Sequence, residues 1–193
     1  MTYFIFRMLG VFVFLNLFFC YIIFSDDYKL KLNESTLQFS ANYLTFFYKV
    51  AGCTEFEGQI YWDPNDLKRS VFQGYMKVDS IKTGFSSLDK KLLSKSFFYA
   101  KAYPTIYFSS SKITWVKDNR YLVNGVVTVK GIQKMIEQEL TVLQDPLSLD
   151  KVIFKSQFKL NRKEFDIGSS IPDFMVDSIV MVTFSFTTKK RLR

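Results

Sequence analysis

The sequence contains few side chains that could act as a nucleophile, a general base or a metal ligand. None of its 193 residues is histidine, which excludes a Ser/His/Asp triad, a Cys/His pair and every histidine-containing zinc site. Its two cysteines, Cys20 and Cys53, are too few for a thiolate cluster. Glu137 and Glu139 lie two residues apart, a spacing that on a strand describes an exposed charged face. We therefore expect no enzymatic activity, no cofactor and no bound metal.

The first 25 residues have the composition of a targeting segment. Arg7 carries the only charge before an uncharged stretch at 8–24, and Ser25 and Asp26 then restore polarity. This order is typical of a secretory signal peptide, although the uncharged stretch is also close to the short limit of a membrane span. We expect residues 1–25 to be a cleaved signal peptide or a retained anchor in the inner membrane. Residues 26–193 are then a periplasmic or secreted domain.

The cysteines allow no disulfide within a processed chain. Cys20 lies in the leader, where the bulky Phe18 and Phe19 before it disfavour acylation as a lipoprotein. Once the leader is removed, Cys53 is the only cysteine that remains. The domain must therefore be stabilised by packing.

Length and charge describe one basic domain. Residues 26–193 have the size of a single domain with one core. The net charge is +8, but the lysines are scattered and form no basic run, so we expect no nucleic acid as a partner. A basic exported protein is attracted to anionic membrane surfaces, which makes a membrane surface an expected partner. The sequence leaves a homodimer open.

Short segments of alternating apolar and polar residues fill most of residues 26–193. In one of them Val152, Phe154 and Phe158 alternate with lysine and glutamine. Such segments, separated by turn residues, are typical of an antiparallel all-β domain. Leucines at helical spacing predict one short helix, at 87–96, between the third and fourth strands. We expect eight strands, at 36–43, 56–62, 71–81, 105–116, 120–130, 134–143, 152–160 and 178–187.

Eight antiparallel strands can form a sandwich or a closed barrel, and periodicity alone does not choose between them. The interior of an eight-stranded barrel can be filled by side chains or can hold one small ligand. The 22 phenylalanines and 11 tyrosines could line a channel. They could equally form an ordinary aromatic core, which composition by itself favours.

Four short motifs, in order, resemble the YceI family between about Tyr28 and Thr188. The strongest is the pair Phe97 and Phe98 followed by the strand entry Tyr-Pro-Thr-Ile-Tyr-Phe at 103–108. The others are the strand, glycine turn and strand at 127–136, the set Asn161, Arg162, Phe165 and Gly168, and the start, with Ser35, Thr36, Leu37, Phe39 and Gly58.

The chain departs from the family pattern at several polar positions. Lys91 and Leu93 stand where many members have histidine and arginine, and Tyr43 replaces another common histidine. Ser96 and Tyr99 replace common acidic residues, and Asp166 replaces a common glycine. These changes leave the resemblance in fold intact, but ligand chemistry that depends on the missing groups does not carry over.

The resemblance implies a lipocalin-like, eight-stranded antiparallel barrel that binds a polyisoprenoid lipid for transport, storage or metabolism. The lipid would be a quinone-type molecule or a prenyl diphosphate, with its chain in an apolar channel. Lys90, Lys91, Lys95 and Arg162 are candidates for its polar head. The alternative is a membrane-tethered structural or interaction barrel with a filled core and no lipid. The expected channel residues are Phe39, Tyr43, Met76, Phe97, Phe98, Phe108, Val127, Val129, Phe154, Phe158 and Phe184.

Overall fold

The computed structural model describes residues 26–30, 34–44 and 47–190. The predicted leader, residues 1–25, lies outside the described residues, so its role as a signal peptide or anchor stays a prediction. Within the described ranges, no helix is long and apolar enough to cross a membrane.

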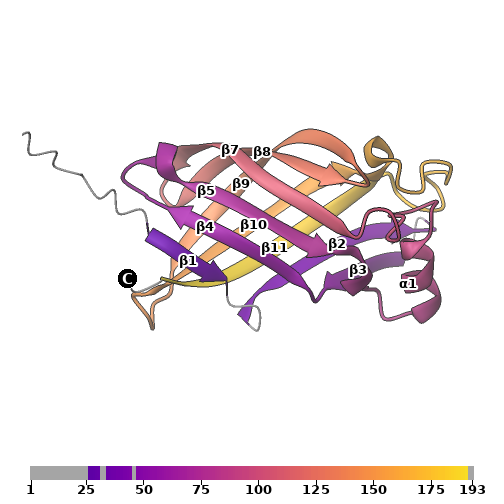
Figure 1. Ribbon diagram of the computed structural model, residues 1–193, viewed down its shortest axis with the longest axis horizontal. Helices are drawn as coiled ribbons and strands as arrows, with labels where there is room; N and C mark the ends of the chain where they lie inside the picture. Colours follow the sequence, from indigo (N-terminus) through magenta and orange to yellow (C-terminus); the bar gives the residue numbers. More distant parts are fainter. Residues whose placement is uncertain (1–25, 31–33, 45–46, 191–193) are drawn as a thin grey trace, which may run out of the picture.

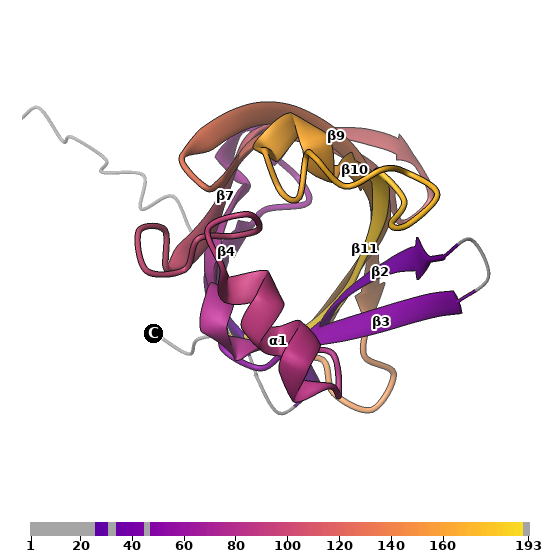
Figure 2. The ribbon, with the colours of Figure 1, turned by 90° about the vertical axis from the view of Figure 1, so that its right-hand side faces the viewer.

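The described residues form one antiparallel sheet that curls into a barrel, as Figures 1 and 2 show from the side and from one end. The sheet is 11-stranded, and an additional pairing between its first strand and β11 closes it. The all-β fold class is therefore confirmed. The strands are β1 (Asp26–Leu30), β2 (Thr36–Tyr43), β3 (Phe47–Cys53), β4 (Phe56–Trp62), β5 (Val71–Lys77), β6 (Ile81–Lys82), β7 (Thr105–Lys117), β8 (Arg120–Val129), β9 (Ile132–Gln144), β10 (Lys151–Asn161) and β11 (Ile179–Lys190). One helix, α1 (Ser86–Leu93), and the 3-10 turns Leu67–Arg69, Val78–Ser80 and Arg162–Phe165 complete it.

The 11 strands occupy eight positions around the barrel. β1 and β2 pair with successive parts of β11, since Leu30 lies opposite Thr188 and Thr36 lies opposite Ser185. β3 and β4 share the next position, because β3 pairs with β2 and β4 pairs with β1. β5 and β6 share the third position, beside β4 and β3. The predicted number of eight therefore describes the barrel, although three of its strands are split in two.

Three sequence-based predictions about the strands were wrong in detail. β1 and β3 were not expected, and the strand predicted at 71–81 is interrupted by the 3-10 turn Val78–Ser80. The Ser80 hydroxyl explains the interruption, because it donates to the Lys77 carbonyl and accepts from the Glu55 amide. Such local serine bonds compete with a regular strand ladder. β3 was missed because the turn before it begins at Leu44, with φ of 50°, where a glycine would have signalled a turn.

Helix α1 is shorter than the predicted 87–96. It ends at Leu93, and the Ser94 amide and hydroxyl both donate to the Lys91 carbonyl. This serine closes the last turn, so Lys95 lies beyond the helix. In Figure 2 α1 lies across part of one end of the barrel.

An aromatic cluster fills the opposite end of the barrel. The Trp62 ring lies edge-on to Tyr121, with centroids 4.8 Å apart, and to Phe154 at 5.8 Å. Phe154 is completely buried, and Phe72 packs edge-on against it at 5.3 Å. Edge-to-face pairs add about 0.5–1.5 kcal/mol each beyond burial. The connections β4–β5, β7–β8 and β9–β10 lie at this end, which we call the closed end.

Candidate ligand-binding cavity

A cavity of about 1250 Å³ lies inside the barrel, between the aromatic cluster of the closed end and helix α1. It exceeds the roughly 300–1,000 Å³ of ordinary small-molecule pockets. Phe154 and Leu140 of the aromatic end form its floor, and Leu88 and Leu92 of α1 lie at its mouth. The cavity therefore has room for one long molecule and extends from this floor to the α1 end.

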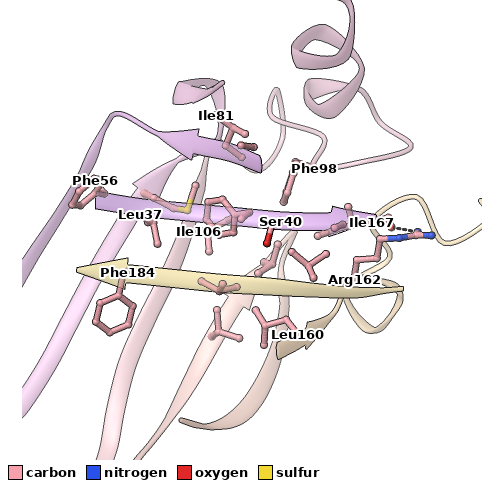
Figure 3. A pocket seen from close by; sticks show the side chains of 18 of the residues that line it. Leu37, Ser40, Phe56, Ile81, Phe98, Ile106, Leu160, Arg162, Ile167 and Phe184 are labelled. Atoms are coloured by element: carbon pink, nitrogen blue, oxygen red, sulfur yellow. Dashed lines mark hydrogen bonds between the residues drawn. The ribbon is translucent and has the colours of Figure 1, made fainter. Parts of the chain in front are cut away.

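The walls are apolar because alternate residues of each strand point inward. On β8, Val123, Val127 and Val129 are buried and line the cavity, while the residues at 124, 126 and 128 lie on the outer face. Figure 3 shows side chains from several strands converging on the space, among them Leu37, Ile106 and Phe184. An apolar wall of this kind selects hydrocarbon chains by shape and offers few hydrogen bonds.

Two glycines widen the cavity between β4 and β5. Gly58 and Gly74 lie opposite each other at inward-facing positions and line the cavity. A Cβ atom on Gly74 would lie 2.8 Å from the backbone oxygen of Glu57, so the two strands approach too closely there for a larger residue. The wall there consists of backbone without side chains. The sequence signal for it is a glycine in the apolar phase of an alternating strand.

The structure brings every predicted channel residue, and two of the four predicted cationic residues, to this cavity. Phe154 lies at the floor, and Tyr43 is half-exposed at the rim beside the mouth. That these residues contact a ligand stays a prediction. The residues that line the cavity are Phe39, Tyr43, Met76, Phe97, Phe98, Phe108, Val127, Val129, Phe154, Phe158, Phe184, Lys91 and Arg162.

The guanidinium of Arg162 donates all its hydrogen bonds to backbone carbonyls of the protein itself. Its side chain is 4% exposed, and its Nε donates to the Asp177 carbonyl over 2.9 Å. Nη1 donates to the carbonyls of Ile167 and Gly168, and Nη2 to those of Ile171 and Val176. A guanidinium has five N–H donors, so none is left for a ligand head. Burial lowers the pKa of Arg162 from its ordinary value, an effect opposed by Asp173 and Asp177.

The three candidate lysines differ in their place. Lys91 lines the mouth of the cavity, with its Nζ 5.8 Å from the ring centroid of Phe97. Lys95 lies over the ring of Tyr99 at 6.0 Å, and Lys90 is exposed on α1. Neither Lys90 nor Lys95 is a lining residue. Of the predicted cationic groups, Lys91 is thus the one whose charge is available at the cavity.

Sequence reasoning missed Gln138, a polar residue inside the apolar barrel. It lies on β9 at an inward-facing position, is 6% exposed and lines the cavity. Its Oε1 lies 3.1 Å from the Ser156 hydroxyl, which also donates to the Glu139 carbonyl over 2.7 Å. The ladder between β9 and β10 ends at Ser156 and Leu140. The sequence does contain a signal for it, because this glutamine stands at a strand position where the alternation calls for an apolar residue.

The described part of the chain offers no metal site, since no group of three or more His, Cys, Asp or Glu side chains could hold an ion there.

Cys53 is a buried free thiol whose Sγ lies 3.0 Å from the Ser80 hydroxyl. Burial raises its pKa, which keeps it protonated and unreactive. The arrangement is suited to holding an apolar molecule.

Known proteins share both the sequence pattern and the barrel. A UPF0312 protein of Vibrio cholerae serotype O1 is 25% identical over 146 residues, which are 73% of this chain and 77% of the relative. A UPF0312 protein of Shewanella denitrificans is 21% identical over 163 residues, 80% of this chain and 85% of that one.

Solved structures show the same fold. BcnA of Burkholderia cenocepacia superposes with a TM-score of 0.77 at 23% identity, over 82% of this chain and 98% of its own. A polyisoprenoid binding domain from Saccharophagus degradans gives a TM-score of 0.67 at 15% identity, over 85% and 98%. The YceI-like domain family matches residues 28–188, nearly the whole described barrel. The chain therefore belongs to the YceI family.

Proposed function

We propose that this protein is an exported, non-enzymatic carrier that holds one polyisoprenoid-type lipid in its barrel. The observation that carries the proposal is the apolar cavity of about 1250 Å³, closed at one end by aromatic rings and reached from the other. The similar domain from Saccharophagus degradans, which is a polyisoprenoid binding domain, supports the ligand class. The filled barrel, the competing hypothesis, is hard to reconcile with so large an internal space.

The apolar wall suits a carrier that must both load and release its lipid. Each buried methylene gains roughly 0.8 kcal/mol relative to water. A lipid comes from a bilayer, however, where its chain is already in an apolar medium, so this term largely cancels during exchange. Shape and the few polar contacts of the cavity then decide which lipid is bound.

The surface around the mouth fits an anionic bilayer. Phe85, before α1, is 59% exposed, and Phe174, in the β10–β11 loop, is 67% exposed. Lys90 and Lys91 lie on α1, and Lys95 follows two residues after its end. None of the three lysines forms an ion pair with another described residue. Exposed aromatic side chains with lysines beside them are the composition of membrane-surface contacts. We propose that the mouth docks on the membrane that supplies the lipid.

The direct test is the lipid content of the protein purified from its native source. Organic extraction and mass spectrometry should find an isoprenoid lipid close to one per protein. Protein stripped of that lipid should take it up again from vesicles. Protein that carries no lipid and takes none up would favour the structural barrel instead.

A further inference from the structure

We propose that Gln138, held in place by Ser156, forms a hydrogen-bonding subsite at the floor of the cavity, which binds the neutral, oxygen-bearing end of the lipid. This inference rests on the proposed function and adds to it the orientation and the chemical class of the ligand. The lipid would enter polar end first, with its chain extending towards the mouth at α1.

Gln138 lies at the deep end of the cavity. Its partner in the neighbouring strand β8 is Val123, which is buried. The next inward-facing residue of β9 is Leu140. Val123 and Leu140 both belong to the aromatic cluster of the closed end, together with Phe154. Among the residues that line the cavity, Gln138 is therefore a polar side chain set against its apolar floor.

Half of the Gln138 amide has no partner in the protein. Oε1 bonds to Ser156, whereas Nε2 has no hydrogen bond to any of the described residues. No side-chain nitrogen or oxygen in the described chain is both sealed from solvent and without a partner, so Nε2 must open into the cavity. If the amide is turned by 180°, its oxygen takes that place. In either orientation one polar atom faces the ligand.

The unpaired amide atom discriminates between lipid ends. A hydrocarbon end placed against it would strip its water and return no hydrogen bond, which is costly for a buried polar group. A hydroxyl can bond to the amide in both orientations, and a carbonyl can accept from Nε2. The floor therefore favours an alcohol-like end in either orientation, and a quinone-like end as well when Nε2 faces the cavity.

A charged head does not fit the floor. The charged residues that line the cavity are Glu57, Lys91 and Arg162. Glu57 is exposed, Lys91 lies at the mouth, and Arg162 has used its donors on backbone carbonyls. A diphosphate beside Gln138 would thus be a buried charge with no counter-charge, which is far more costly than a neutral group.

The test compares three probes with the same isoprenoid chain: geranylgeraniol, the hydrocarbon of the same skeleton, and geranylgeranyl diphosphate. Binding to lipid-stripped protein is measured by displacement of a fluorescent lipid. The wild type should bind the alcohol about tenfold or more tightly than either other probe. Gln138→Leu should lose most of this preference while it binds the hydrocarbon at least as well. Gln157→Leu, on the outer face of β10, is the matched control and should change nothing.

The outcomes separate the subsite from the carrier function. Wild-type protein that binds none of the probes would contradict the proposed function itself. Binding without preference for the alcohol, or an equal loss of all probes in Gln138→Leu, would overturn the subsite and leave Gln138 as a closure between β9 and β10. Gln138→Met, with a flexible apolar side chain of similar length, repeats the test if the leucine variant does not fold.

Discussion

Arg162 fixes the long connection between β10 and β11 from inside the barrel wall. Five backbone carbonyls between residues 167 and 177 accept from its guanidinium. Without it, four of those oxygens would lose their donor, whereas the Gly168 oxygen would keep the bond from the Ile171 amide. At the scale of single residues, the mouth of the cavity is therefore shaped by an arginine whose five donors are all used within the protein.

Replacing Arg162 by lysine should destabilise the protein without changing which lipid it prefers. Lysine has three donors on a single nitrogen and cannot reach carbonyls on several sides. We expect the free energy of unfolding to fall by about 2–4 kcal/mol, measured by chemical denaturation. Arg69→Lys, at an exposed ion pair with Asp66, is the control and should cost far less. A variant of native stability that fails to bind lipid would show that Arg162 serves the ligand.

Asp166 links the same connection to the β8–β9 turn. Hydrogen bonds from Lys130 and Ser169 lower the pKa of its carboxyl below the ordinary value. A carboxyl with a lowered folded-state pKa stabilises the fold above its unfolded pKa, and that contribution is lost as pH falls through the folded pKa. Stability should therefore decline in the acid range below the usual pKa of aspartate.

The pH dependence can be assigned to Asp166 by thermal unfolding between mildly acidic and strongly acidic pH. In Asp166→Asn, the decline of Tm on acidification should be smaller than in the wild type. Asp118→Asn is a matched control, because both aspartates have left-handed backbone, with φ of 52° and 49°, which asparagine tolerates. An identical pH profile in Asp166→Asn and wild type would remove Asp166 from the explanation.

At the scale of elements, alternation predicted the bounds of several strands closely. β4 was predicted with the observed bounds, and β7, β8 and β10 to within one residue at each end. Some of the breaks were missed, because a hydroxyl such as that of Ser80, or a left-handed Leu44, ends a strand without a glycine or proline to mark it.

The same limit applied to the candidate site. Alternation of apolar and polar residues shows which side chains of a strand point inward, so the individual apolar residues of the cavity wall could be predicted. The burial of a polar side chain could not be predicted in this way, because it depends on hydrogen-bond partners that are distant in the sequence. Gln138 bonds to Ser156 on the neighbouring strand, and Arg162 bonds to carbonyls up to 15 residues away. Neither partnership has a local pattern.

The inward face of β8 gives a test of the cavity as an open space. Val127 and Val129 are buried and line it, so tryptophan at either position should obstruct it. The bulk would enter empty volume, and the variants should keep near-native thermal stability in the lipid-free state. A filled core would instead lose about 1–3 kcal/mol through overpacking.

Uptake of a fluorescent isoprenoid from vesicles is the measurement for Val127→Trp and Val129→Trp. We expect uptake to fall at least tenfold in one or both variants. Val126→Trp, on the outer face of β8 next to Val127, is the control and should take up lipid normally. Unchanged uptake with an inward tryptophan would place the lipid chain elsewhere.

At the scale of the whole molecule, the two ends of the barrel have separate roles. Asp26, the first described residue, pairs with Trp62 at the closed end, whereas α1 lies at the other end (Figure 1), with its cavity-lining residues at the mouth. If residues 1–25 are retained as an anchor, they would tether the closed end and leave the mouth facing away from that attachment. If they are removed, the whole barrel is free to carry its lipid between membranes.

This polarity predicts that binding to anionic vesicles depends on the mouth and not on the closed end. The double variant Lys90→Glu/Lys91→Glu should bind vesicles of phosphatidylcholine and phosphatidylglycerol at least tenfold more weakly, since each lysine near an anionic surface contributes about 1 kcal/mol. Phe85→Ser should weaken the remaining, salt-resistant part of binding, because Phe85 is 59% exposed beside α1. Cosedimentation at low and high salt separates the two contributions.

The closed end supplies the controls for that experiment. Leu147 and Leu149, in the β9–β10 connection, are 94% and 92% exposed, so Leu147→Ser/Leu149→Ser removes more exposed apolar surface than Phe85→Ser, at the end away from the mouth. Lys112→Glu reverses an exposed charge on β7. Both controls should keep vesicle binding if the mouth is the docking surface. If the leucine variant instead loses binding and the Lys90→Glu/Lys91→Glu variant retains it, the closed end faces the bilayer, and lipid must reach the cavity through a second protein or after release from the membrane.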